Sequence, residues 1–210
     1  MGARRMFCAL MLGAELGQAL ERALAAALRG AEQGALGRHA RSFAPVRGAD
    51  MHLTLAFAGA LEEPAALRFE GALARSFAGA QGPGLELGRA DAFPDPRRAR
   101  VLVVRVRELC GTHLADLATR AVRAAEEAGV ELPDGERPFS PHVTLARVRE
   151  RRGRRPAIPE AFFGLDFALP WQPRAAAWVE SPGGGAPYRV VAEFLLAEGS
   201  PEPPRAKSAP

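Results

Sequence analysis

A pentapeptide occurs twice in the chain, as HLTLA at residues 52–56 and as HVTLA at residues 142–146. The two copies differ only at their second residue. Since the chain holds four His and four Thr, two His-x-Thr pairs would arise by chance with a probability on the order of 0.2%. The repeat therefore predicts two related structural units that display the same pair of polar side chains.

Both copies have the residue pattern of a half-buried β-strand. Because side chains alternate between the two faces of a strand, His52 and Thr54 should share one face while their apolar neighbours enter a core. The same alternation should hold for His142 and Thr144. If the two units pack together, two imidazoles and two hydroxyls line one cleft. This arrangement suits phosphoryl chemistry.

The chemistry of such a cleft follows from the groups themselves. A neutral His can take a proton from a water that attacks phosphorus, and a protonated His can give one to the departing oxygen. The Thr hydroxyls can bind the phosphoryl oxygens. No metal or cofactor is needed. Zinc is the chemical alternative, but two His this far apart in sequence, with neither a nearby Cys nor a third ligand, fit it poorly.

The rest of the chain alternates irregularly between strand-like and helix-like segments. Leu residues at four-residue spacing predict a helix over 16–30, and Ala-rich amphipathic segments predict helices over 62–77 and 112–128. Strand patterns cover residues 6–12, 43–47, 51–57, 85–90, 100–106, 139–148, 175–180 and 188–196. Together they indicate an α+β fold with mainly antiparallel sheets. We expect one domain over residues 1–198 and a disordered tail over 199–210.

Composition limits the compartment and the partners. Cys8 and Cys110 cannot build a disulfide framework, which favours a reducing cytoplasm. No apolar run approaches the roughly 18 to 20 residues of a membrane helix, so we expect no membrane partner. The formal net charge of +4 permits an anionic partner. All but one of the cations are Arg, however, and the abundant Ala, Gly and Pro point to GC-rich codon usage as a source of that Arg content.

The paired motifs resemble those of the 2H phosphoesterase superfamily, and the flanking sequence looks like its RNA 2′,3′-cyclic phosphodiesterase branch, also called the 2′-5′ RNA ligase family. The resemblance runs from Arg5 to Leu196. It rests on RMFCAL at 5–10, HLTLAFAG at 52–59, the segment 93–104 and FSPHVTLAR at 139–147, together with Ser181 and Tyr188. It implies a bilobal, pseudo-two-fold α+β fold, in which two mainly antiparallel sheets line a central cleft with helices outside.

The resemblance also implies a reaction and a set of roles. The family opens a 2′,3′-cyclic phosphate at an RNA end to a 2′-phosphate. His52 would then be the proton donor, His142 the base that activates water, and Thr54 and Thr144 the phosphate-binding hydroxyls. The expected partner is an RNA 3′ end, with tRNA fragments among the candidates, and the expected state is a monomer without a cofactor.

Two other functions stay open at this point. The same site can run the reverse reaction and join tRNA halves through a 2′-5′ bond. The chain can also be a non-catalytic module that binds RNA ends.

Two further residues are candidates for substrate binding. Arg147 lies five residues after His142, so simple alternation points it to the opposite face, whereas a bulge would return it to the cleft. The resemblance favours contact between Arg147 and a phosphate or base. Phe139 is expected either to stack on the terminal base or to belong to the core. The Arg-rich run 147–155 can follow an RNA backbone or form a solvated loop.

Overall fold

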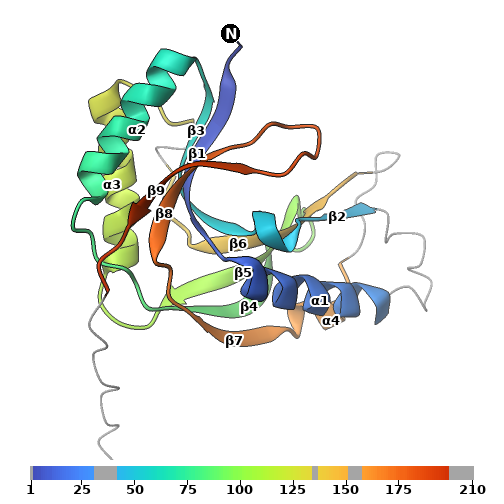
Figure 1. The fold of residues 1–210 in the computed structure, drawn as a ribbon. Coiled ribbons are helices and arrows are strands. Elements are labelled where there is room, and N and C mark those ends of the chain that lie inside the picture. Colours follow the sequence, from blue (N-terminus) through green and yellow to red (C-terminus); the bar gives the residue numbers. More distant parts are fainter. Residues whose placement is uncertain (1, 31–41, 134–136, 151–157, 199–210) are drawn as a thin grey trace, which may run out of the picture.

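A computed structural model describes residues 2–30, 42–133, 137–150 and 158–198 (Figure 1). Its helices are α1 (Ala14–Gly30), α2 (Glu63–Phe77), α3 (His113–Ala128) and α4 (Glu160–Phe163), and η2 (Gly48–Asp50) is a short 3-10 helix. Its strands are β1 (Arg4–Met11), β2 (Phe43–Pro45), β3 (His52–Leu61), β4 (Leu85–Phe93), β5 (Val101–Glu108), β6 (His142–Val148), β7 (Asp166–Trp171), β8 (Ala175–Glu180) and β9 (Arg189–Leu195). The predicted tail at 199–210 lies outside the described residues.

The strands pair in the order β7-β4-β5-β6-β3-β1-β8-β9, with β2 attached to β6. Each of these pairings is antiparallel, which confirms the predicted α+β class. The sheet has two halves, β7 to β6 and β3 to β9. Within the described residues these halves meet at one residue pair, Leu53 with Val143. The two predicted sheets are thus joined into one at the second residue of each repeated motif.

Each half is covered by a helix that starts from the other half. Helix α1 follows β1 but packs against α4 and β6, whereas α3 follows β5 but packs against α2 and β3. Figure 1 shows α2 and α3 on one side of the molecule and α1 with α4 on another. The order β1-α1-β3 in the first half, in which β2 and η2 are inserted before β3, matches β5-α3-β6 in the second. This correspondence is the pseudo-two-fold relation that the resemblance implied.

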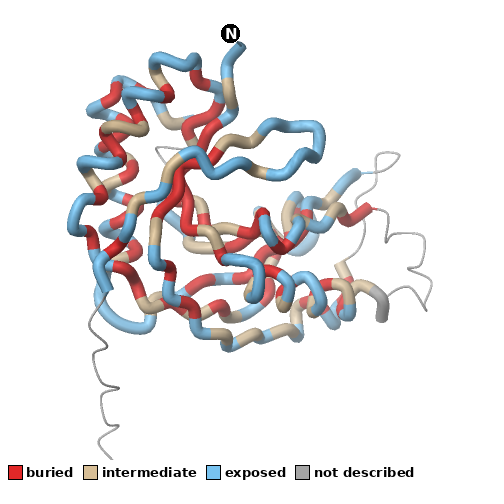
Figure 2. The backbone as a smooth tube through the Cα atoms, in the orientation of Figure 1, coloured by how far each residue is buried: buried red, intermediate tan, exposed pale blue. Residues whose placement is uncertain are grey.

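A hydrophobic core extends through both halves, and Leu53 and Val143 are fully buried at the junction. In Figure 2 the buried stretches follow the central strands, and exposed stretches follow the outer sides of the helices and the β8–β9 hairpin. A second, smaller apolar cluster surrounds Phe7, whose ring stacks on His52. This cluster therefore lies on the face of the sheet that carries the polar side chains of the first motif.

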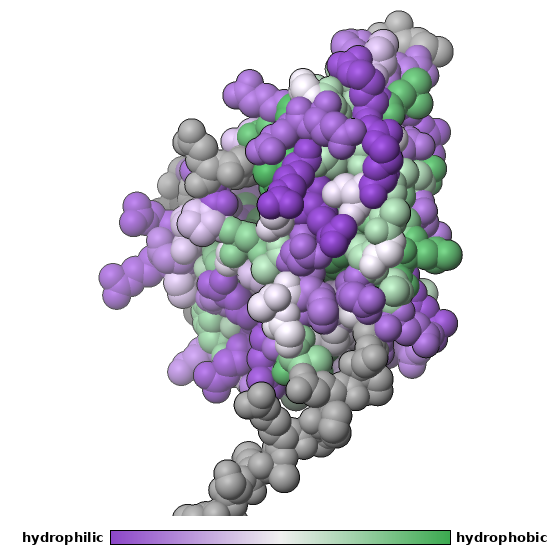
Figure 3. Space-filling model, turned by 90° about the vertical axis from the view of Figure 1, so that its left-hand side faces the viewer, coloured by the Kyte–Doolittle hydropathy of each residue, from purple (hydrophilic) through white to green (hydrophobic). Residues whose placement is uncertain are grey.

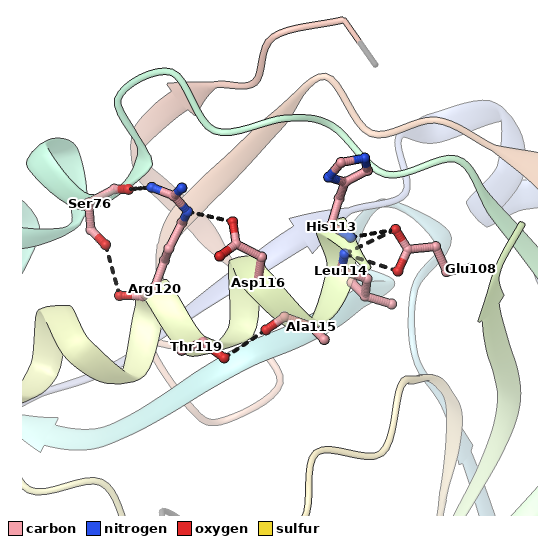
Figure 4. A network of polar contacts seen from close by, with 8 residues as sticks. All are labelled: Ser76, Glu108, His113, Leu114, Ala115, Asp116, Thr119 and Arg120. Carbon is pink, nitrogen blue, oxygen red and sulfur yellow. Dashed lines mark hydrogen bonds and ion pairs between the residues drawn. The ribbon is translucent and has the colours of Figure 1, made fainter. Parts of the chain in front are cut away.

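The carboxylate of Glu108 fixes the start of α3, because it accepts hydrogen bonds from the backbone N–H groups of His113 and Leu114 (Figure 4). These N–H groups have no partner within the helix. Two reciprocal bonds join α3 to α2: the Ser76 hydroxyl donates to the Arg120 carbonyl at 3.0 Å, and the Arg120 guanidinium donates to the Ser76 carbonyl at 2.7 Å. Figure 3 views this side and shows hydrophilic residues over much of it, with hydrophobic areas between them. Helix α3 is thus fixed at its start by Glu108 of β5 and further along by Ser76 of α2.

Three elements were not predicted from the sequence. These are the 3-10 helix η2, the short helix α4 and the strand β7, which forms one edge of the sheet beside β4. In the described part of the chain, no helix has both the length and the apolar character required to cross a membrane.

Candidate active site

The pairing of β3 with β6 brings the two repeated motifs together. With Leu53 opposite Val143, His52 stands opposite Thr144 and Thr54 stands opposite His142. The four polar side chains are half-buried and share one face, because the apolar residues between them point into the core. In an antiparallel ladder of this register the two His are diagonal neighbours, for which a spacing of about 7 to 8 Å is usual. That spacing leaves room for a phosphate group between the imidazoles.

The backbone holds both imidazoles in the same way. The Nδ1 atom of His52 lies 2.7 Å from the carbonyl oxygen of Asp50, and Nδ1 of His142 lies 2.7 Å from that of Ser140. A carbonyl oxygen can only accept a hydrogen bond, so each Nδ1 carries the hydrogen and each neutral ring has its free lone pair on Nε2. The hydroxyls of Thr54 and Thr144 have no hydrogen-bond partner among the described residues. Two Nε2 atoms and two hydroxyls thus remain for a ligand.

Burial is the main cause that lowers the pKa of both His below the ordinary value. The positive charge of Arg147 and the neighbouring His142 lower the pKa of His52 further, and Arg105 does the same for His142. The hydrogen bond to each carbonyl opposes these effects in part. Both rings therefore favour the neutral form until an anion binds beside them.

Aromatic side chains orient both imidazoles. Phe7 stacks on His52 with ring centroids 4.6 Å apart, and Tyr188 meets His52 edge-on at 5.4 Å. On the other side, Phe93 meets His142 edge-on at 4.8 Å. Packed rings of this kind restrict rotation of the imidazoles, so that the two Nε2 atoms keep a fixed direction.

A β-bulge occurs at the same place in both motifs. In β3 the register skips Leu55, and in β6 it skips Leu145, so that each Leu and the Ala after it are both buried. The next residues, Phe57 and Arg147, consequently return to the side of the His and Thr. Simple alternation, which pointed Arg147 to the opposite face, does not hold here.

The bulge places Arg147 beside His52. Its guanidinium donates a hydrogen bond to the Tyr188 hydroxyl at 3.3 Å and has no carboxylate partner among the described residues. Its charge is near enough to lower the pKa of His52. Residues 151–155 of the Arg-rich run lie outside the described part of the chain.

A hollow of about 850 Å³ opens next to Thr54 and His142. It is lined by residues of β1, β3, β4, α3 and the segment before β6, among them Phe57, Phe93 and Phe139. The Phe139 side chain is 39% exposed. Of the two placements expected for Phe139, the structure therefore favours the cleft over the core.

Sequence reasoning missed several residues around the motifs. Arg105 donates to Asp91 and to the Ser140 hydroxyl, and its guanidinium lies over Phe93. Asp50 contacts both His52 and Tyr188. Asp50 and Ser140 stand at the same place in the two motifs, two residues before the His. A comparison of these two positions could have drawn attention to them. Within the described residues, no group of three His, Cys, Asp or Glu is arranged to hold a metal ion.

Comparison with known sequences gives matches over most of the chain. A model of the 2′-5′ RNA ligase superfamily matches residues 16–184. The chain is 34% identical over 98 residues to an RNA 2′,3′-cyclic phosphodiesterase of Bacillus subtilis, a match that covers 47% of this chain and 51%, about half, of that protein. It is 30% identical over 158 residues to an RNA 2′,3′-cyclic phosphodiesterase of Thermus thermophilus, with 74% of this chain and 77% of that protein covered.

Solved structures show the same fold. The crystal structure of a Thermus thermophilus protein matches with a TM-score of 0.66 and 26% identity, over 91% of this chain and 97% of that chain. Escherichia coli LigT complexed with 3′-AMP matches with a TM-score of 0.62 and 22% identity, over 92% of this chain and 98% of that chain.

Proposed function

Since the chain belongs to the 2′-5′ RNA ligase superfamily, we propose that it hydrolyses RNA 2′,3′-cyclic phosphate ends to 2′-phosphomonoesters. One observation carries the proposal: two His-x-Thr pairs meet across a single residue pair, with each His held at Nδ1 by a backbone carbonyl. The names of the two related phosphodiesterases agree with this reaction.

The reaction follows from the free Nε2 atoms. The cyclic phosphate, a monoanion, binds between the imidazoles and favours protonation of one of them. Following the family resemblance, Nε2 of His142 accepts a proton from water while the water oxygen attacks phosphorus. The bond from phosphorus to O3′ breaks, and Nε2 of His52 gives its proton to O3′. One water is consumed, and the product is a 2′-phosphomonoester.

In the proposed reaction the two Thr hydroxyls and the Arg147 guanidinium have different roles. The unpartnered hydroxyls of Thr54 and Thr144 bind the non-bridging phosphoryl oxygens, where negative charge increases in the transition state. Arg147 supplies the cation beside them. All the groups used are side chains of the protein, so the proposed mechanism needs no metal ion.

The hollow next to His142 is where we expect the terminal nucleoside to lie. Its aromatic lining suits an unpaired base, which proteins commonly hold by stacking. Phe139, the most exposed of the described Phe residues, is our candidate for that contact. The substrate class is thus a single-stranded RNA 3′ end, which includes tRNA fragments.

The compartment, the extent of the domain and the oligomeric state are further parts of the proposal. Cys8 and Cys110 are both free thiols, which fits a reducing cytoplasm. We propose that residues 1–198 act as one bilobal domain and as a monomer, because each half already contributes one His to the cleft.

Product analysis tests the proposal. A 2′,3′-cyclic nucleotide is incubated with the protein in excess EDTA, and the products are separated by HPLC against 2′- and 3′-phosphate standards. We expect the 2′-phosphate alone. Formation of the 3′-phosphate would contradict the assignment of O3′ as the leaving oxygen, and absence of turnover would favour an RNA-end-binding module.

The family name favours one second activity, the joining of RNA halves through a 2′-5′ bond. This is the same ring opening with a ribose 5′-hydroxyl in place of water: the O5′ atom attacks phosphorus, the bond from phosphorus to O3′ breaks, and O3′ receives the proton. Cleaved tRNA halves incubated with the protein and resolved on a denaturing gel would show it as a product of full tRNA length.

A further inference from the structure

Asp50 lies between the first motif and the loop that joins β8 to β9, and its acceptor atoms are all used. The residue is buried, with 8% exposed. Its Oδ1 accepts the backbone N–H of Tyr188 at 3.0 Å, and its Oδ2 accepts Nε of Arg47 at 2.9 Å. Its backbone oxygen accepts Nδ1 of His52. One residue thus connects the imidazole to a segment 138 positions away in the sequence.

The loop that Asp50 holds has a backbone with unusual freedom. Gly183, Gly184 and Gly185 follow one another, each with a positive φ. Glycine loses more conformational freedom on folding than any other residue, so a loop of this kind needs external contacts to keep one shape. Arg47 provides a second contact, since its Nη2 donates to the carbonyl of Gly185 at 2.7 Å. The Arg47–Asp50 ion pair therefore holds the loop at two points.

The end of that loop is Tyr188, which forms part of the wall around His52. Its ring lies edge-on to His52 at 5.4 Å and to Phe7 at 5.3 Å, and its hydroxyl accepts the hydrogen bond from Arg147. If the loop moved, His52 would lose one of its two aromatic contacts and gain access to water. Arg147 would lose its hydroxyl partner at the same time.

In the second motif, the residue that corresponds to Asp50 has no carboxylate. Ser140 stands two residues before His142, and its carbonyl accepts Nδ1 at the same 2.7 Å distance as in the first motif. Its hydroxyl meets Arg105. Since a serine suffices to hold the imidazole through its backbone, the carboxylate at position 50 is not needed for that bond. It contacts Tyr188 and Arg47 instead, and its charge raises the pKa of His52.

We propose that Asp50 is a positioning residue for His52: its carboxylate fixes Tyr188 and the β8–β9 loop against the imidazole. The effect on turnover rests on the proposed function, whereas the effect on the geometry does not. This difference allows the two ideas to be tested separately.

The test uses Asp50→Ser, which introduces the residue found at the corresponding place in the second motif. Serine leaves the backbone carbonyl in place, but its shorter side chain does not span the distance to Tyr188 and Arg47. Asp50→Asn is the conservative variant, because an amide oxygen can still accept the Tyr188 N–H. Glu127→Gln is the matched control, since it breaks an exposed ion pair with Arg75 on the helices α2 and α3.

Two quantities are measured on each full-length variant. The first is the nuclear Overhauser effect between the rings of Tyr188 and His52. It is easily assigned because the chain contains one Tyr and four His. The second is kcat on a 2′,3′-cyclic nucleotide. We expect Asp50→Ser to lose the ring contact and to lower kcat roughly 10- to 100-fold, the scale of a small misplacement of a catalytic group. Asp50→Asn should retain the contact and most of the turnover, and Glu127→Gln should match the wild type.

The outcomes separate the positioning role from the reaction. If Asp50→Ser keeps the ring contact, or loses it with kcat unchanged, the positioning role is wrong. If Asp50→Ser does not fold, the same criteria apply to Asp50→Leu, which fills the buried space and keeps the backbone carbonyl but offers no acceptor to the Tyr188 N–H. If the wild type shows no turnover while the variant loses the contact, Asp50 positions the loop and the proposed reaction fails.

Discussion

Gly17 of α1 and Gly48 of η2 lie backbone against backbone, so closely that a Cβ atom on Gly17 would fall 2.1 Å from the carbonyl oxygen of Gly48. The Gly48 N–H also donates to the Glu21 carboxylate on α1 at 3.3 Å. Because η2 ends at Asp50 and leads directly into β3, this contact sets the position of the first motif from outside the cleft.

Gly17→Ala should therefore destabilise the fold and reduce turnover together. The added methyl group must push η2 away, and overpacking of this kind costs about 1 to 3 kcal/mol. Gly71→Ala is the control. Its Cβ would meet only the Arg75 guanidinium, at 3.5 Å, and an Ala in place of a Gly inside a helix stabilises by about 0.5 to 1 kcal/mol. Urea unfolding and kcat of both variants test this. Equal stability of the two variants would contradict it.

Replacement of either motif His by Ala should lower kcat on a 2′,3′-cyclic nucleotide by about 10²- to 10⁴-fold, the usual contribution of one general acid or base. The leaving group distinguishes the two roles. A p-nitrophenyl phosphodiester needs no proton donor, so His52→Ala should lose much less on that substrate than His142→Ala. The opposite order would exchange the assigned roles of the two imidazoles.

Arg147→Met should weaken substrate binding without unfolding the protein, because the side chain is exposed and its described hydrogen bond goes to the Tyr188 hydroxyl. A hydrogen bond to a charged group contributes about 1.5 to 3 kcal/mol, which corresponds to a loss in kcat/KM of roughly 10- to 100-fold. Loss of the cation should also raise the pKa of His52, since Arg147 lowers it. NMR titration of the imidazoles and kinetics at several salt concentrations measure both effects. If the pKa of His52 is the same in Arg147→Met as in the wild type, Arg147 does not act on His52. Arg75→Met is the control.

Phe139→Ala should raise KM for a dinucleotide that ends in a cyclic phosphate, while kcat changes little. Stacking of one base on an aromatic ring contributes about 1 to 3 kcal/mol. Phe139→Tyr, which keeps the ring, should behave as the wild type. If Phe139→Ala leaves KM unchanged but lowers the melting temperature, the ring serves the core instead.

The stability of the protein should fall when the pH drops below about 6.5, the ordinary pKa of His. Burial lowers the pKa of His52 and of His142 in the folded state. Below 6.5 the unfolded chain therefore binds more protons than the folded one, and the free energy of unfolding decreases as the pH falls. In thermal unfolding between pH 5 and pH 8, the melting temperature should depend less on pH in His52→Gln than in the wild type. It should depend least on pH in the double variant that also carries His142→Gln. The same slope in all three proteins would contradict this.

The sequence allowed prediction of the parts of the fold that have strong local patterns. The repeat located the strands of both motifs, and four-residue Leu spacing located α1. Strand β7 has no such pattern: it contains Pro170 and a residue with positive φ, Ala168, and it forms only an edge of the sheet. Four residues are too few for α4 to show a helical period.

The site residues could be predicted where the repeated motif determines their position. They could not be predicted where their position depends on contacts between distant parts of the chain. The four motif residues follow from strand alternation and from the matching copies. Whether Arg147 faces the cleft depends on a bulge, which alternation alone cannot reveal. The contact between Asp50 and Tyr188 joins residues 138 positions apart, and no local signal marks either residue as the partner of the other.

The exchange of α1 and α3 between the halves has a mechanical consequence. A hinge motion that widened the cleft would pull α1 away from β6 and α3 away from β3, and would bring buried side chains such as Leu114 and Leu117 into water. Exposure of one such side chain costs about 1.5 to 3 kcal/mol. The width of the cleft is therefore set when the chain folds, and the proposed RNA end would have to enter a cleft that does not close around it.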